Sequence, residues 1–230
     1  MKHTPTATIS PTSITSDATL ADLAASWAGA ARVMQRHGLD FCCRGQQTVA
    51  AACAAKGLDA TQVLAELRAT TAAVPGNARW EQRSTEDLVQ HVLDQYHAAH
   101  RAELPRLLQM ARKVEAVHGE RPDCPRGLAV HLQHVADELE LHMQKEEQML
   151  FPMLLAGHPF ATAPVQVMES EHLEHGRNLA RLRELAHDFV PPPAACGTWR
   201  ALYLGLEELE RDVMQHIHLE NHVLFPRAGR

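Results

Sequence analysis

Apolar residues recur at helical spacing over nearly the whole chain, and glycine or proline interrupts each run. One apolar face over residues 19–37 ends at Gly38, a residue type that is common just after helix C-termini. Two further short helices are predicted over residues 47–56 and 60–71. Four longer amphipathic stretches then predict helices over residues 84–118, 126–155, 165–190 and 198–225. The pattern therefore predicts an all-α protein.

The connections between the four long stretches are short and rich in proline and glycine. Short connections place successive helices antiparallel, so we predict an up-down-up-down four-helix bundle that is preceded by a small helical domain. The domain boundaries follow from the composition: a disordered tail over residues 1–18, the small helical domain over 19–72, a linker over 73–83 and the bundle over 84–230. The tail is rich in Thr, Ser and Pro and lacks the apolar core of a secretory signal.

The two halves of the predicted bundle repeat one polar pattern. The sequence His-x-x-x-Glu-x-x-x-Leu-Phe-Pro occurs at His142–Pro152 and again, 74 residues later, at His216–Pro226. The shorter pattern His-x-x-His also occurs twice, 75 residues apart, at His97 and His100 and at His172 and His175. Each half thus contains a His-x-x-His helix followed by a His-x-x-x-Glu helix, which indicates an internal duplication.

This repeat predicts a metal site inside the bundle. Residues four apart share a helix face, so His142 and Glu146 can reach one site, as can His216 and Glu220. The other two helices would supply His97 and His172. Imidazole and carboxylate ligands without a thiolate suit iron, manganese or zinc. We expect each glutamate to bridge two metal ions and each ion to keep a position open for a small ligand. The alternative is a pair of polar helix faces, which the apolar neighbours and the repeated spacing disfavour.

Two more carboxylates share the repeat. Glu138 lies four residues before His142, and Asp212 lies four residues before His216. We predict that Glu138 and Asp212 support the ligands from behind or line a proton or ion path, because ligating histidines usually donate their second N–H to a carboxylate. The same role is predicted for the remaining repeated histidines, His100 and His175. For Glu138 and Asp212 the alternative is that they are solvated charges at the rim of the bundle. His100 and His175 would lie behind the ligands or at the rim, and the alternative for them is direct ligation.

Composition narrows the possible partners. The formal net charge is −6, 16 of the 230 residues are histidine, and no stripe of Lys and Arg resembles a nucleic-acid-binding surface. No apolar run reaches the roughly 18–20 residues that span a bilayer. Five cysteines, two of them adjacent, fit a disulfide framework poorly. We therefore expect a soluble cytoplasmic protein that binds neither nucleic acid nor membrane.

The adjacent pair Cys42 and Cys43 lies in a turn of the small domain, between Phe41 and Arg44. One interpretation is two structural thiols. The other is a thiol pair that holds iron transiently, exchanges sulfur or responds to redox change. Arg44 could lower the pKa of a thiol in such a pair.

At this point the chain resembles a known family, the di-iron iron–sulfur cluster repair proteins of the YtfE/ScdA type, also called repair of iron centres. The resemblance covers residues 20–227 and depends on several motifs: Asp40-Phe-Cys-Cys-Arg-Gly45, the two His-x-x-x-Glu-x-x-x-Leu-Phe-Pro segments, Val167-Met-Glu-Ser-Glu-His172 and Pro191-Pro-Pro-Ala-Ala-Cys196. These motifs are more specific than the general hemerythrin-like pattern.

The resemblance implies two iron ions joined by an oxo or hydroxo bridge. Its ligands fall on the six residues found from the repeat, His97, His142, Glu146, His172, His216 and Glu220, with both glutamates as bridges. Its characteristic thiol pair falls on Cys42 and Cys43. The implied protein is bacterial and cytoplasmic, a monomer or homodimer that repairs iron–sulfur proteins damaged by nitric oxide or oxidative stress by donating iron.

Three other functions stay open at this stage. The bundle could bind or reduce nitric oxide at open iron positions, which would make it an enzyme. It could bind or sense dioxygen, although oxygen-carrying hemerythrins use a fifth histidine and the ligands here divide evenly between two metals. It could also be a structural zinc bundle, because zinc outcompetes ferrous iron for such ligands.

Overall fold

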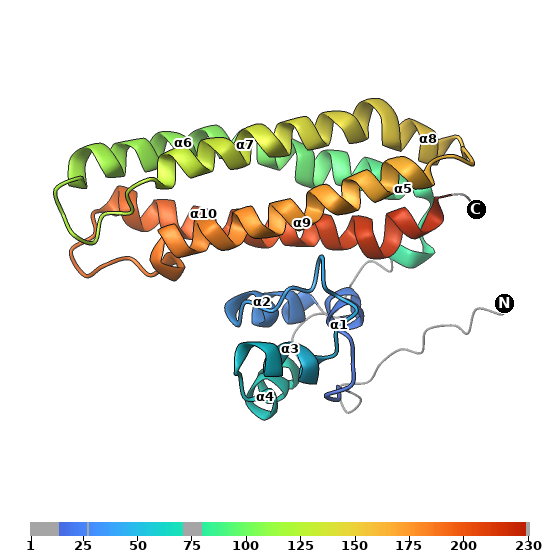
Figure 1. The fold of residues 1–230 in the computed structure, drawn as a ribbon, viewed down its shortest axis with the longest axis horizontal. Helices are drawn as coiled ribbons and strands as arrows, with labels where there is room; N and C mark the ends of the chain where they lie inside the picture. The colour runs from blue at the N-terminus through green and yellow to red at the C-terminus, as the bar shows by residue number, and fades with distance from the viewer. Residues whose placement is uncertain (1–13, 27, 71–79, 229–230) are drawn as a thin grey trace. The chain divides into compact units, whose positions relative to one another are not determined.

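The computed structural model describes residues 14–26, 28–70 and 80–228, and the chain divides into two compact units, Met1–Glu81 and Gln82–Arg230. In the described residues the only strand-like pairing is an isolated bridge between Thr19 and Thr48. Both units are built from helices (Figure 1), so the predicted all-α class is confirmed. No helix in the described part of the chain is both long and apolar enough to cross a membrane.

In its described residues the N-terminal unit packs four short helices around an apolar core. They are α1 (Leu20–Ser26), α2 (Ala28–Arg36), α3 (Val49–Lys56) and α4 (Ala60–Thr70). The Thr48 side chain accepts a hydrogen bond from the amide of Ala51 and caps α3, which ends at Gly57 with a left-handed φ of 66°. The single helix predicted over 19–37 is described as two helices, α1 and α2, on either side of residue 27, which lies outside the described residues.

The small unit begins earlier than the sequence suggested. Residues 1–13 of the predicted tail lie outside the described residues, but Ile14 is fully buried, and its carbonyl accepts a 2.6 Å hydrogen bond from Arg68 Nη2. The carbonyl of Ala18 accepts from the amide of Val49. The tail prediction is therefore wrong for residues 14–18, because an apolar side chain and backbone pairing anchor them. Most of the predicted linker, residues 73–79, lies outside the described residues, and Trp80–Gln82 forms a 3₁₀ turn.

The C-terminal unit is a bundle of four long helical stretches (Figure 1). The first joins α5 (Thr85–His91), the π-helical segment η3 (Val92–His97) and α6 (Ala98–His118). The second joins α7 (Leu128–Lys145), the π segment η4 (Glu146–Leu150) and α8 (Phe151–Leu155). The third is α9 (Thr162–Leu185), and the last joins α10 (Gly197–Leu219), the π segment η6 (Glu220–Leu224) and the 3₁₀ turn η7 (Phe225–Arg227). The predicted four-helix bundle is confirmed.

The π segments are local features that position polar side chains. In η4 the amide of Phe151 donates to the carbonyl of Glu146, five residues back. In η6 the amide of Phe225 likewise donates to the carbonyl of Glu220. A proline follows each phenylalanine, lacks an amide hydrogen and crowds the carbonyl four residues earlier, which favours a wider turn. Single π turns inside α-helices are common at functional sites. Both start at the repeated glutamates.

Candidate metal centre

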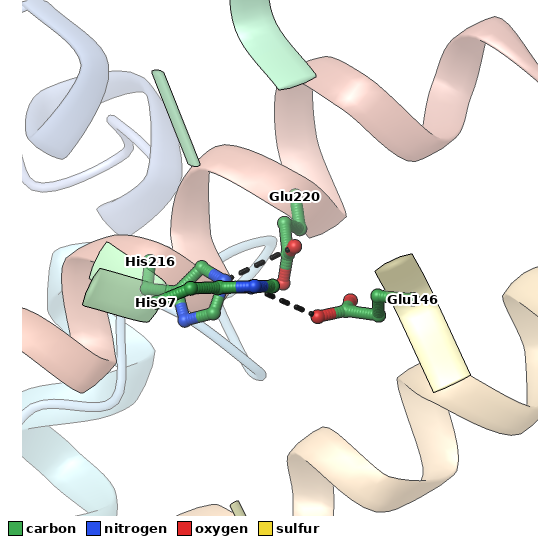
Figure 2. Close-up of side chains that lie close together, drawn as sticks. All are labelled: His97, Glu146, His216 and Glu220. Atoms are coloured by element: carbon green, nitrogen blue, oxygen red, sulfur yellow. Dashed lines mark ion pairs between the residues drawn. The ribbon is translucent and has the colours of Figure 1, made fainter. Parts of the chain in front are cut away.

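Six buried side chains form two overlapping groups between the helices of the bundle. The first group is His97, Glu146, His216 and Glu220, and the second is His142, Glu146, His172 and Glu220. Within each group the candidate ligand atoms lie within 4.8 Å of one another. Each group takes one histidine from each half of the duplicated sequence, and both glutamates belong to both groups. Figure 2 shows the first group: His216 and Glu220 come from the last helical stretch, His97 and Glu146 come from the first and the second, and the side chains point toward a common centre.

Each glutamate directs one carboxylate oxygen to each group. Glu146 places Oε2 3.3 Å from His97 Nε2 and Oε1 3.4 Å from His142 Nε2. Glu220 places Oε1 3.1 Å from His216 Nε2 and Oε2 3.3 Å from His172 Nε2. Ligand atoms bound at about 2.0–2.2 Å to one ion lie roughly 3.0–3.4 Å apart at common coordination angles. The spacing of these nitrogens and oxygens therefore fits ligands around two shared cations.

The hydrogen-bond pattern also leaves the ligand atoms facing a common centre. His142 Nδ1 donates to Glu171 and His172 Nδ1 donates to Asn221 Oδ1, so in the neutral tautomers both Nε2 atoms carry lone pairs. These two Nε2 atoms nevertheless lie only 3.1 Å apart. Two facing lone pairs repel unless a cation lies between them. Both oxygens of Glu146 and of Glu220 are buried without a hydrogen-bond partner among the described residues. These residues fit a pair of metal ions.

Burial keeps the imidazoles neutral, as metal ligands must be. Desolvation, reinforced by the charge of His216, lowers the pKa of His97 to about 4. Desolvation likewise lowers the pKa of His142 to about 4, against the opposing hydrogen bond from Glu171. Burial, followed by the negative charge of Glu220, raises the pKa of Glu146 well above its usual range. Two carboxylates buried among neutral imidazoles are unfavourable without positive charge, which bound cations would supply.

The same shifts predict an acid-sensitive metal-free bundle. His97, His100, His142 and His175 have pKa values lowered by burial to about 4, 2, 4 and 3, so they stay neutral in the folded protein at pH 5. In the unfolded chain they take up protons below their usual pKa, which favours unfolding by about 2 kcal/mol per histidine between pH 7 and pH 5. Protonation of Glu146, whose pKa is raised, acts in the opposite direction. Because one carboxyl can offset at most about 3 kcal/mol over two pH units, we expect a net loss of about 5 kcal/mol in the free energy of unfolding.

Urea denaturation of the metal-free protein at pH 7 and pH 5, followed by circular dichroism, measures this loss. An unfolding free energy that is unchanged or higher at pH 5 would contradict neutral, buried histidines.

Three acceptors that the repeat alone did not identify orient the candidate ligand histidines. His97 Nδ1 donates to Glu147 at 2.7 Å, His142 Nδ1 to Glu171 at 3.0 Å, and His172 Nδ1 to Asn221 at 2.7 Å. Hydrogen bonding to His142, together with Lys145, lowers the pKa of Glu171 to about 2, against the effect of burial. The repeat contained the signal: Glu147 and Asn221 follow the two glutamates at the same 74-residue offset, and Glu171 precedes His172.

The four residues predicted to lie beside the ligands have different environments. His100 and His175 are buried, and their rings lie 5.5 Å from the ring of His216 and 4.8 Å from that of His142, respectively. Glu138 is half-buried, and Asp212 pairs with Arg211 at 3.4 Å. Burial raises the pKa of Asp212. None of the four belongs to either metal-binding group, and their supporting roles stay predictions.

The predicted thiol pair forms a separate small cluster in the N-terminal unit. Cys42 Sγ lies 3.6 Å from Cys43 Sγ, well beyond the ~2 Å of a disulfide, and donates to Asp40 Oδ1 at 3.2 Å. Asp40, Cys42 and Cys43 together make a third possible metal-binding group. The hydrogen bond with Cys43, then burial and the charge of Asp40, raise the pKa of the Cys42 thiol well above its usual value. The suggestion that Arg44 lowers the pKa of the pair is therefore wrong for Cys42.

Comparison with known proteins defines the class of the bundle. Residues 88–228 match the family described as the hemerythrin HHE cation binding domain. Residues 16–71 match ScdA_N, described as a domain of unknown function. The C-terminal unit is therefore a hemerythrin-type cation-binding bundle whose two buried His/Glu clusters share Glu146 and Glu220, as expected of a binuclear metal site.

Curated relatives define the family more closely. The chain is 46% identical over 202 residues to the iron–sulfur cluster repair protein YtfE of Yersinia pseudotuberculosis serotype IB (strain PB1/+), which covers 87% of this chain and 91% of that protein. It is 45% identical over 216 residues to the YtfE protein of Pectobacterium carotovorum subsp. carotovorum (strain PC1), covering 93% and 97%. The chain belongs to the family of YtfE-type iron–sulfur cluster repair proteins, which confirms the resemblance found in the motifs.

Proposed function

We propose that the bundle holds two iron ions, one in each His/Glu group, and donates iron to clusters damaged by nitric oxide or oxidative stress in the bacterial cytoplasm. The observation that carries this proposal is the pair of buried groups related by the duplication and joined by both glutamates. Relatives that cover most of the chain are named iron–sulfur cluster repair proteins, which supports the choice of client.

The donor atoms suit iron that must be released again. Each group offers two imidazole nitrogens and two carboxylate oxygens but no sulfur. Thiolates, which hold iron in clusters, bind it more firmly than such a set. An oxo or hydroxo group that bridges the two ions would complete the di-iron centre. Protonation of the glutamates or histidines removes ligands from both positions, since metal binding requires the deprotonated forms.

The remaining polar residues suit transfer. His100 and His175 lie buried against ligand histidines. Glu138 and Asp212 lie one helical turn before His142 and His216, respectively. We assign these four residues to the exit path. In the N-terminal unit, Cys42 and Cys43 with Asp40 would receive or relay the iron, since these three can hold a metal ion together. The predicted linker over residues 73–83 would then connect a unit that relays iron to a bundle that stores it.

Transfer of labelled iron tests the proposal. Protein loaded with ⁵⁷Fe is mixed anaerobically with a [4Fe–4S] hydratase that has lost iron to nitric oxide, and the re-isolated client is examined by Mössbauer spectroscopy and activity. We expect ⁵⁷Fe in the client cluster. The double variant Cys42→Ala/Cys43→Ala should load iron normally but transfer it more slowly, because the thiolates that would receive the iron are removed.

One control shows that transfer comes from the protein and not from free iron. Free ferrous iron at the same concentration, in the presence of a ferrous chelator, should not restore the client. A client that regains activity without ⁵⁷Fe from the protein would exclude iron donation.

A second function is favoured by one observation. Each group has four protein ligand atoms, fewer than the five or six that iron commonly accepts, so each position can bind a small ligand such as nitric oxide or dioxygen. The thiol double variant separates the two functions, because it should bind nitric oxide as the wild type does.

A further inference from the structure

The duplication allows the surroundings of the two metal positions to be compared residue by residue. The 74-residue offset relates Glu147 to Asn221, and the 75-residue offset relates Tyr96 to Glu171. Both pairs lie next to ligand residues, so a symmetric centre would show equivalent contacts from all four. Glu147 and Asn221 make equivalent contacts, each accepting from Nδ1 of the corresponding histidine, but Glu171 and Tyr96 do not.

Three ligand histidines are oriented by an acceptor on Nδ1. At the His142–His172 position both histidines have one, namely Glu171 at 3.0 Å and Asn221 Oδ1 at 2.7 Å. At the other position His97 donates to Glu147 at 2.7 Å. Salt bridges hold the two carboxylates in place, to Lys145 for Glu171 and to Arg101 for Glu147.

His216 is the exception. Its Nδ1 is buried and has no hydrogen-bond partner among the described residues. Tyr96 is the counterpart of Glu171 in the duplication, so it takes the place beside His216 that Glu171 has beside His142. Its ring stacks on the His216 ring, with centroids 5.1 Å apart and planes within 8°. The Tyr96 ring packs against the face of the His216 imidazole. It therefore places no acceptor in the plane of that imidazole, where the Nδ1–H of His216 points.

The backbone breaks the symmetry at the same place. Tyr96 and His97 end the π segment Val92–His97, where the amide of Ala98 donates to the carbonyl of Leu93. The equivalent stretch around His172 is regular α-helix throughout Thr162–Leu185. Both departures from symmetry therefore affect the position formed by His97 and His216.

We infer that the two metal positions are unequal, that the His97–His216 position releases its iron first, and that Tyr96 is the positioning residue that sets this order. An acceptor on the second ring nitrogen raises the basicity of a ligand histidine and fixes its ring, and losing one typically weakens metal binding about 10–100-fold. This inference rests on the proposed function, in which both positions hold iron. It adds that one ion is the exchangeable cargo and the other remains longer.

Release of iron to a chelator tests the order without any client. The full-length diferrous protein is mixed with excess ferrous chelator, and the coloured complex is followed by stopped-flow absorbance. We expect two phases of one iron per chain, with rates that differ about tenfold or more. Tyr96→Glu supplies the acceptor that Glu171 supplies elsewhere and should slow the fast phase about tenfold. The matched control Tyr96→Phe keeps the stacked ring and should change it less than about twofold.

A second variant and a site-resolved measurement keep the test decisive if Tyr96→Glu does not fold. Glu171→Leu removes the acceptor from His142 and should speed the slow phase. Wild-type protein is crystallised after one equivalent of iron has been released to the chelator. Anomalous scattering at the iron edge should then remain at the position formed by His142 and His172. A single release phase in the wild type, or first loss from the His142–His172 position, overturns the inference and leaves iron donation standing. Protein that contains no iron after anaerobic purification overturns both.

Discussion

Replacing Glu146 by glutamine will remove both metal ions, although it changes a single side chain. Glu146 directs Oε2 toward His97 of one group and Oε1 toward His142 of the other, so its loss takes a charged ligand from both positions. We expect metal affinity at each position to fall more than about 100-fold, since losing even a residue behind a ligand costs about 10–100-fold. Metal analysis after anaerobic desalting measures the remaining iron per chain.

Matched variants show whether the loss of both ions depends on Glu146 being shared by the two groups. His97→Ala removes a ligand from the first group alone and should leave one ion, held by the second group. Glu184→Gln changes an exposed glutamate of α9 that pairs with Arg181, and it should retain both ions. Full retention of one ion in Glu146→Gln would mean that Glu146 serves a single position.

Removing the metal ions will lower the melting temperature of the bundle by about 8–16 °C. Ligands that bind only the folded state stabilise it by about 4 kcal/mol at a thousand times their Kd, and each kcal/mol shifts Tm by about 2–4 °C for a unit of this size. The physical reason is local: without cations, Glu146 and Glu220 are buried without hydrogen-bond partners among the described residues.

Differential scanning calorimetry of the iron-loaded and the chelator-treated protein measures this shift. The variant Glu146→Gln should melt near the metal-free protein and should not respond to added iron. Equal melting temperatures with and without metal would indicate that the buried carboxylates are stabilised by something other than cations.

The duplication explains why the six side chains that gather in the bundle could be predicted from the sequence. Two copies of one spacing identified the six residues that the fold gathers into overlapping groups, because helical periodicity alone places His142 beside Glu146 and His216 beside Glu220. The helix ends were also predictable where a cap marks them, as at Ser84, which accepts a hydrogen bond from the amide of Asp87.

Other features depend on three-dimensional packing and were missed. The π segments at Glu146 and Glu220 change the local register, which a strict 3.6-residue period does not anticipate. Glu171 reaches His142 from another helix, 29 residues away, so no local pattern relates the two. Burial of Cys42 next to Cys43 and Asp40 raised a pKa that sequence proximity to Arg44 was expected to lower.

The most direct test of the account is the anomalous scattering of anaerobically grown crystals at the iron edge. We predict two iron peaks per chain, one ligated by His97 and His216 and the other by His142 and His172, with Glu146 and Glu220 each reaching both. A lone peak, or iron held by residues outside these two groups, would contradict a binuclear centre shared between the halves of the duplicated bundle.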